Sequence, residues 1–185
     1  EKNFKGVSIA KEEHKLGMRG SSTCIVNFDN VRVPSKNMLG KRKDGFKILV
    51  ETLNGGRITI AALSLGILER AKDIAIEYTK TRKQFGINLH QFQAIQFMLA
   101  DMEAAIHAST LLILDSAKKR AEGKPFAKEA SIAKLYASEN ATIACRNAIQ
   151  ILGGYGYMSE YKIERFYRDS KLCEIGEGTS EIQRL

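Results

Sequence analysis

The chain has 185 residues, of which 44% are hydrophobic and 27% charged, so it is long enough for one packed domain or for one domain and part of another. Its formal net charge is +8, but the basic residues are scattered and do not alternate with aromatic residues, which argues against a nucleic-acid-binding surface. Solvated helix ends account for this charge, and a phosphate-bearing ligand is the next most natural explanation.

The first forty residues have the pattern of short β-strands. Alternating apolar residues predict strands at 7–10, 23–28 and 31–33, and glycines and the Asp29-Asn30 pair mark the turns between them. Three short strands leave too many open edges to be stable alone. We therefore expect the missing strands of this sheet to lie upstream of Glu1.

From about residue 44 the apolar period changes to that of helices. The pattern predicts one long helix over about 44–79, bent near Gly55-Gly56, and a second over about 91–122 that Gly123 ends. Pro125 suits the entry to a third helix over about 126–152, and a shorter helix covers about 160–171. Three long antiparallel helices joined by short links predict a mainly α protein with a helix bundle.

The segment Gly176-Glu177-Gly178-Thr179-Ser180 places one carboxylate between two glycines, just before a helix that Thr179 or Ser180 would cap. Glycines let the backbone approach a ligand closely, and a carboxylate there can act as a general base on a nearby C–H group. A capped turn with an exposed glutamate explains the same residues. The chain ends as an apolar face would begin, which predicts that the last helix continues beyond Leu185.

Three further segments have both a structural and a functional interpretation. Gln150–Tyr157 is a glycine-ended helix or a backbone packed against a flat ligand; it has neither the Rossmann nor the Walker pattern. Arg82–Gly86 is a basic helix end or an arginine that grips a phosphate. Arg57 follows two glycines inside a helix, where either a tight helix crossing or a close ligand would explain them.

The cysteines and histidines do not form a metal site or a disulfide framework. Cys24, Cys145 and Cys173 are odd in number and far apart, and the three histidines are equally dispersed. Buried free thiols in a reducing compartment fit this pattern.

Taken together and in this order, these motifs resemble the acyl-CoA dehydrogenase family over essentially the whole chain, with the short-chain, butyryl-CoA-like branch most similar. The matching segments are 16–23, 28–34, 45–57, 82–86, 93–96, 99–102, 150–157, 167–169 and the Glu177 segment. The resemblance implies that residues 1–38 are the C-terminal part of a middle β-domain and residues 39–185 an up-down four-helix-bundle domain whose last helix is truncated.

The resemblance also implies roles for individual residues. Glu177 matches the catalytic base, and Gly56 occupies the position where one subgroup carries its base instead. Matches to positions that contact the acyl-CoA are Asn54, Arg57 and Gly178. Matches to positions that hold FAD, some of them in a neighbouring subunit, are Arg82, Phe85, Gln93, Gln150, Ile151, Leu152, Gly153, Gly154, Thr179 and Ser180.

The implied activity is α,β-dehydrogenation of an acyl-CoA thioester, with Glu177 taking the α-proton, the flavin taking the β-hydride, and electrons passing to an electron-transferring flavoprotein. The implied assembly is a homo-oligomer, in the bacterial cytoplasm or the mitochondrial matrix. An acyl-CoA oxidase-like enzyme and a non-catalytic helical scaffold remain alternatives. Because the N-terminal half is absent, we expect the 185-residue chain alone to show little or no turnover.

Overall fold

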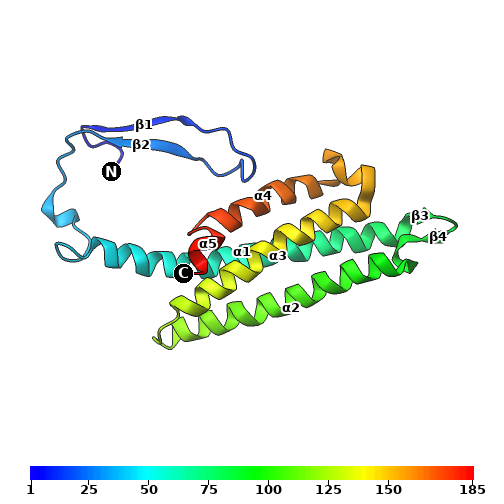
Figure 1. Ribbon diagram of the computed structural model, residues 1–185. Coiled ribbons are helices and arrows are strands. Elements are labelled where there is room, and N and C mark those ends of the chain that lie inside the picture. The colour runs from blue at the N-terminus through cyan, green and yellow to red at the C-terminus, as the bar shows by residue number, and fades with distance from the viewer.

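The computed structural model describes residues 1–185 and shows a bundle of long helices with a β-hairpin beside it (Figure 1). The strands are β1 Val7–Glu12, β2 Cys24–Phe28, β3 Lys83–Gln84 and β4 Ile87–Asn88, and the helices are α1 Gly45–Thr81, α2 Gln93–Ala121, α3 Ala127–Leu152, α4 Ile163–Ile175 and α5 Ser180–Gln183. Short 3₁₀ turns at 35–37, 89–91, 153–157 and 159–161 connect them.

Helices α1 and α3 run in the same direction, α2 runs antiparallel to both, and α4 folds back along α3 and α1 (Figure 1). The expected mainly α, four-helix bundle is therefore confirmed. The turn after α4 brings α5 and the C-terminus to the middle of the bundle, against α3 (Figure 1).

Small residues explain why α1 and α3 make the most extensive contact in the bundle. Ala61, Ala71 and Ala75 on α1 and a row of alanines on α3 are fully or almost fully buried. Because alanine side chains are short, the two helix backbones can approach closely, while Leu68 and Ile67 fill the remaining space in the main core cluster. This contact holds the middle of α1 at a fixed distance from α3.

The strands differ most from the sequence-based expectation. Strands β1 and β2 pair antiparallel, with Val7 opposite Phe28 and a register shift between Ile9 and Glu12. Residues 31–33 are irregular rather than a strand, because no neighbouring strand offers them a partner. Helix α1 continues through Gly55-Gly56 without interruption. The β3–β4 hairpin was not expected.

Two of the three thiols are buried, as the sequence indicated. Cys145 and Cys173 are fully buried, whereas Cys24 is only half-buried, so the expectation was wrong for that residue. Burial raises the pKa of the Cys145 thiol to about 12. This thiol therefore stays protonated at neutral pH and behaves as a core residue.

Helices α1 and α2 contain 18-residue stretches with mean hydropathies of 1.2 and 1.5, which is long and apolar enough to cross a membrane by length and composition. The sequence alone predicts no membrane span, because no run in it approaches the roughly 20 consecutive apolar residues that a span needs. Two such helices are weak evidence for a membrane span, since helices that pack in a bundle meet the same criterion. Both helices here pack against α3 in the bundle.

Candidate active site

The turn between α4 and α5 carries Glu177 in an unusual backbone conformation. Helix α4 ends at Ile175 and α5 begins at Ser180. Between them Glu177 has φ +57° and Gly178 φ +99°. A left-handed conformation is ordinary for glycine, but for other residues a sparsely populated region costs about 1–3 kcal/mol and persists only when the surroundings hold it.

Three side chains hold this turn through its carbonyl groups. Arg57 Nε and Gln183 Nε2 donate hydrogen bonds of 3.3 and 3.1 Å to the Glu177 carbonyl oxygen. Lys134 Nζ and Gln183 Nε2 donate bonds of 2.7 and 2.9 Å to the Gly178 carbonyl oxygen. Two successive peptide groups are thus fixed from three elements, α1, α3 and α5, which keeps Glu177 in its strained conformation.

The Glu177 side chain lies directly over Gly56 of α1. A Cβ atom built on Gly56 would stand 2.6 Å from Cδ and 3.0 Å from Oε1 of Glu177, which is closer than real side chains pack. A Cβ atom built on Gly55 would stand 3.1 Å from the Arg120 guanidinium carbon. Gly55 therefore makes room for the Arg120 side chain of α2, and Gly56 makes room for the Glu177 side chain of the turn.

Some of the hydrogen-bond donors of Arg57 are used within the chain itself. Its Nη1 donates to Asn54 Oδ1 at 3.1 Å and to Ser131 Oγ at 3.0 Å, and its Nε bonds the Glu177 carbonyl. A guanidinium has five N–H donors, so the two on Nη2 remain for a ligand. Arg57 thus joins the turn, α1 and α3 while keeping donors at the edge of the site.

The backbone N–H of Glu177 has no acceptor within the chain. Backbone amides in a half-buried turn normally have a partner, so this N–H group is suited to an oxygen atom of a ligand. It belongs to the same residue as the carboxylate. A general base and a hydrogen-bond donor for a developing negative charge therefore come from one residue.

A second site lies at the other end of the bundle, beyond the start of α4. A pocket of about 570 Å³ opens between the end of α1, the β3–β4 hairpin and the 3₁₀ turn after α3. Its lining residues come from those segments, from the end of α3 and from the 3₁₀ turn after the hairpin: Tyr78, Arg82, Gln84, Leu89, Ile151, Leu152, Gly153, Gly154, Tyr155 and Met158.

This pocket suits a flat group that carries phosphates. The Arg82 guanidinium lies 5.6 Å from the centre of the Tyr155 ring, so a cation and an aromatic face stand together. Gly153 has φ +61°, and no atom lies within 4 Å of a Cβ built on it or on Gly154. The exposed backbone there lets a ligand come close, and Arg82 supplies paired donors for a phosphate.

Comparison with known proteins identifies the family. The family model described as "Acyl-CoA dehydrogenase, C-terminal domain" matches residues 43–185. The chain belongs to the acyl-CoA dehydrogenase family. This is an oxidoreductase family of flavoproteins, and the resemblance seen in the sequence is confirmed.

Acyl-CoA dehydrogenases of several kinds are similar to this chain. A probable acyl-CoA dehydrogenase of Bacillus subtilis is 53% identical over 97% of the chain and 47% of its own length. The human mitochondrial short-chain specific acyl-CoA dehydrogenase is 50% identical over 97% of the chain and 44% of its own length. A subunit of the caffeyl-CoA reductase–Etf complex of Acetobacterium woodii is 46% identical over 97% of the chain and 48% of its own length.

The structure of butyryl-CoA dehydrogenase from Megasphaera elsdenii superposes with a TM-score of 0.97 and 47% identity, over 100% of this chain and 48% of that one. The chain therefore spans about half the length of the acyl-CoA dehydrogenases it matches.

Most of the residues expected to bind acyl-CoA and FAD in this chain fall into two groups. Asn54, Arg57 and Gly178 lie with Glu177 at the turn, and Thr179 and Ser180 adjoin them. Thr179 caps α5 by accepting from the Ile182 N–H, whereas the Ser180 hydroxyl is buried without a partner. Lining the second pocket are five more of the expected residues: Arg82, Ile151, Leu152, Gly153 and Gly154.

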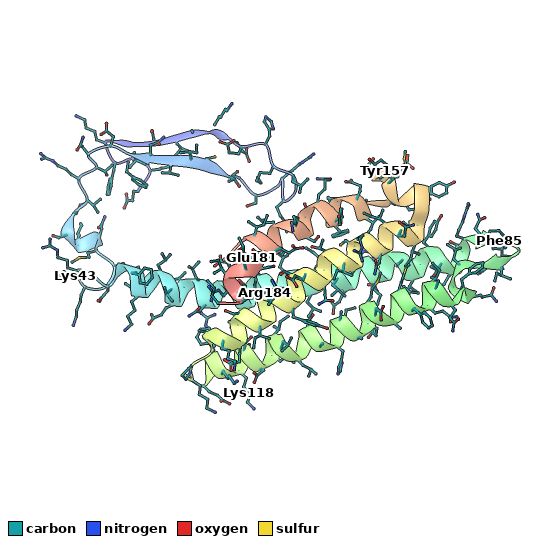
Figure 2. All side chains as sticks on the ribbon, in the orientation of Figure 1. Lys43, Phe85, Lys118, Tyr157, Glu181 and Arg184 are labelled. Atoms are coloured by element: carbon teal, nitrogen blue, oxygen red, sulfur yellow. The ribbon has the colours of Figure 1, made fainter.

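The remaining expected residues lie outside both groups. Phe85 is at the tip of the β3–β4 hairpin and is 93% exposed (Figure 2). Gln93 is the exposed first residue of α2. Gln150 lines a neighbouring pocket of about 810 Å³ with Arg146 and Tyr157.

Sequence reasoning missed several residues that shape these sites. Lys134 and Gln183 hold the turn, and Tyr78 and Tyr155 line the pocket. Lys134 could have been found from its spacing, because it falls on the alanine-rich face of α3, four residues after Ala130. No pattern in the sequence marks Gln183 as a partner of the turn.

Proposed function

We propose that the full-length protein catalyses FAD-dependent α,β-dehydrogenation of an acyl-CoA thioester to the trans-2-enoyl-CoA, with Glu177 as the base. The observation that carries this proposal is the Glu177 carboxylate held over Gly56, beside Arg57, in a strained turn. Membership of the family and likeness to short-chain enzymes support the reaction and a short acyl chain as its substrate.

Glu177 removes the proton on the carbon next to the thioester carbonyl. That proton becomes acidic enough only when negative charge on the carbonyl oxygen is stabilised, and the unpaired Glu177 N–H is the donor in this chain that can do so. Arg57 and Asn54 bind the CoA side of the substrate, and Gly178 lets it approach the turn closely. FAD, when bound, supplies the acceptor for the hydride that leaves the neighbouring carbon.

Residues of the second pocket hold a flavin nucleotide in this proposal. Helix α4 has 13 residues and spans about 20 Å, and it separates the pocket from Thr179 and Ser180. In this proposal the two groups serve different FAD molecules, with Arg82 and the Gln150–Gly154 segment reaching the FAD of a neighbouring subunit. Phe85 projects from the far end of the bundle, as Figure 2 shows, and with Gln93 it extends this contact.

A homo-oligomer, a tetramer or a dimer, follows from the same arrangement. The outer face of α2 supports it, since Phe97, Leu111 and Leu114 are between 55% and 60% exposed. An electron-transferring flavoprotein is the proposed electron acceptor, because one relative is named as a subunit of an Etf complex. Relatives from a bacterium and a mitochondrion support the bacterial cytoplasm or the mitochondrial matrix as its location.

Substitution of the base tests the proposal. In the full-length enzyme, Glu177→Gln removes the proton acceptor, so we expect turnover and exchange of the substrate α-proton with D₂O to fall by about 10²–10⁴-fold. Flavin content is unchanged. Glu181→Gln, an exposed carboxylate on α5, is the matched control and keeps both activities. Undiminished α-proton exchange in Glu177→Gln would remove this residue from its role.

The electron acceptor separates a dehydrogenase from an oxidase. Wild-type enzyme is assayed anaerobically with an artificial acceptor and, separately, in air for peroxide release. We expect acceptor-dependent turnover with little peroxide. Peroxide formation at the rate of substrate oxidation would instead assign the protein to the oxidases.

A further inference from the structure

Lys134 on α3 is the largest fully buried side chain in the protein. A buried ammonium group is costly unless it is paired and hydrogen-bonded, and lysine is rarely buried without a partner. No carboxylate lies within 4.0 Å of its Nζ atom. Burial lowers the pKa of Lys134, as desolvation of a cation must. An apolar residue would fill this place at lower cost, so the charge needs another explanation.

The contacts of Lys134 explain why a charged group is buried at this position. Its Nζ donates to the carbonyl oxygen of Glu174 at 2.9 Å and to that of Gly178 at 2.7 Å. Glu174 is in the last turn of α4, where unpaired carbonyls carry partial negative charge, so the ammonium is stabilised by the end of that helix. The two acceptors lie on either side of Glu177, one before the turn and one within it.

No other side chain connects these two parts of the turn. Within the turn, Arg57 bonds only the Glu177 carbonyl, and Gln183 bonds the carbonyls of Glu177 and Gly178. Lys134 alone also bonds the end of α4. Without it, the start of the turn is held only by the backbone bond from Gly176 N–H to Leu172 O at 2.7 Å. The angle at which the turn leaves α4 then has no anchor on α3.

We propose that Lys134 is the positioning residue for the catalytic base: its buried ammonium fixes the Glu177 turn to α3 and so holds the carboxylate over Gly56. This inference rests on the proposed role of Glu177. It explains why a strained glutamate keeps one conformation between a helix that ends and a helix that begins. Lys134 makes no contact with the carboxylate, and the carbonyl of Gly178 is its one contact with a proposed substrate residue, so it acts through the turn.

The test uses Lys134→Met in the full-length flavoenzyme, because methionine keeps the unbranched side-chain stem as far as Cε and removes the donors. Ala141→Gly is the control: Ala141 is fully buried two turns further along α3, so this variant weakens the same helix without touching the turn. For each variant, kcat, KM, flavin content and α-proton exchange in D₂O are measured, with wild type and Glu177→Gln in parallel.

We expect Lys134→Met to lose about 10²-fold in kcat and in α-proton exchange, since a misplacement of about 1 Å has that effect, while KM and flavin content stay within about twofold. Ala141→Gly keeps kcat. Equal losses in the two variants, or wild-type exchange in Lys134→Met, overturn the inference. An inactive wild type, or an active Glu177→Gln, would contradict the proposed function instead, so the two failures are distinguishable.

Lys134→Gln covers the case in which the methionine variant does not fold. Its amide is neutral and one bond shorter than the ammonium, so it is easier to bury and cannot reach both carbonyls. The expected losses are the same. Failure of both variants to yield soluble flavoprotein, while Ala141→Gly folds, would assign Lys134 to folding and overturn its positioning role.

Discussion

Among single residues, Gly56 and Glu177 are the pair on which the proposed chemistry depends. Gly56 is in the interior of a long helix, where glycine is less stable than alanine by about 1 kcal/mol. The structure explains the choice, because a side chain at this position would occupy the volume of the Glu177 carboxyl group. The helix gives up stability at the point where the base must lie.

Gly56→Ala should therefore separate stability from activity. The added methyl group favours the helix but displaces the carboxylate, so we expect turnover to fall about 10²-fold, the effect of a small misplacement of a catalytic group. Gly66→Ala is the matched control, since Gly66 is in the same helix and nothing lies within 4 Å of its added Cβ. It gains about 1 kcal/mol of helix stability without loss of turnover. Steady-state assays and thermal melts of both variants give the answer, and full activity in Gly56→Ala would contradict the close contact.

At this scale the sequence singled out candidate functional residues but not the contacts that they make. The Gly-Glu-Gly pattern singled out Glu177, and Gly55-Gly56 were recognised as anomalous in a helix. What faces those glycines could not be predicted, since Glu177 reaches Gly56 from a distant part of the chain. Lys134 was overlooked because a lysine in a helix is usually solvated, and only the packing of α4 on α3 buries it.

Among the elements, α4 matters most for the proposed site, because it links the β1–β2 hairpin to the turn that carries Glu177. Arg168 Nη1 donates to the Leu16 carbonyl at 2.8 Å, and Asp169 accepts from the Met18 N–H. Gly17 packs against the backbone of Arg168, where a Cβ would stand 2.6 Å from the carbonyl carbon. Met18 has φ +47°, so this contact also holds a strained residue. The same helix ends at the Glu177 turn, so α4 sets the distance between the two.

Asp169→Ala should loosen this link. A hydrogen bond to a charged group contributes about 1.5–3 kcal/mol, so we expect that loss in the free energy of unfolding and faster tryptic cleavage at Lys15 and Arg19. Asp169→Asn keeps an oxygen acceptor and serves as the control, with a smaller loss. Urea denaturation and timed proteolysis measure the two effects. A cleavage rate in Asp169→Ala equal to that of wild type would mean that the carboxylate does not hold the hairpin.

Helices were predicted more accurately than strands, for a physical reason. Helical periodicity is local, so the expected ranges for α1, α2 and α3 agree with the structure to within about two residues, an uncertainty ordinary for helix ends. Strands need partners, and residues 31–33 have none. The β3–β4 hairpin was missed because its two-residue turn is Phe85-Gly86, and phenylalanine at φ +53° lacks the Asn-Gly or Asp-Gly signal of such turns.

At the scale of the whole molecule, the surface shows that the sites need further protein around them. The β1–β2 hairpin has only two strands, which are marginal alone in water, and it exposes Ile9, Val26 and Phe28. The proposed FAD residues stand in two groups at opposite ends of α4. The chain also spans about half the length of its relatives. In the proposed function, one copy of this chain therefore offers two partial flavin sites.

The 185-residue chain should accordingly be helical but nearly colourless. Its bundle has its own core, so we expect a helical circular dichroism spectrum and a cooperative thermal transition. Neither flavin group encloses the cofactor alone, so added FAD should bind weakly and acyl-CoA turnover should be close to background. Equilibrium dialysis with FAD and a dye-reduction assay test this, with the full-length protein as the positive control. A yellow fragment that oxidises acyl-CoA would mean that these 185 residues complete both sites, with Glu177 shielded by this chain alone.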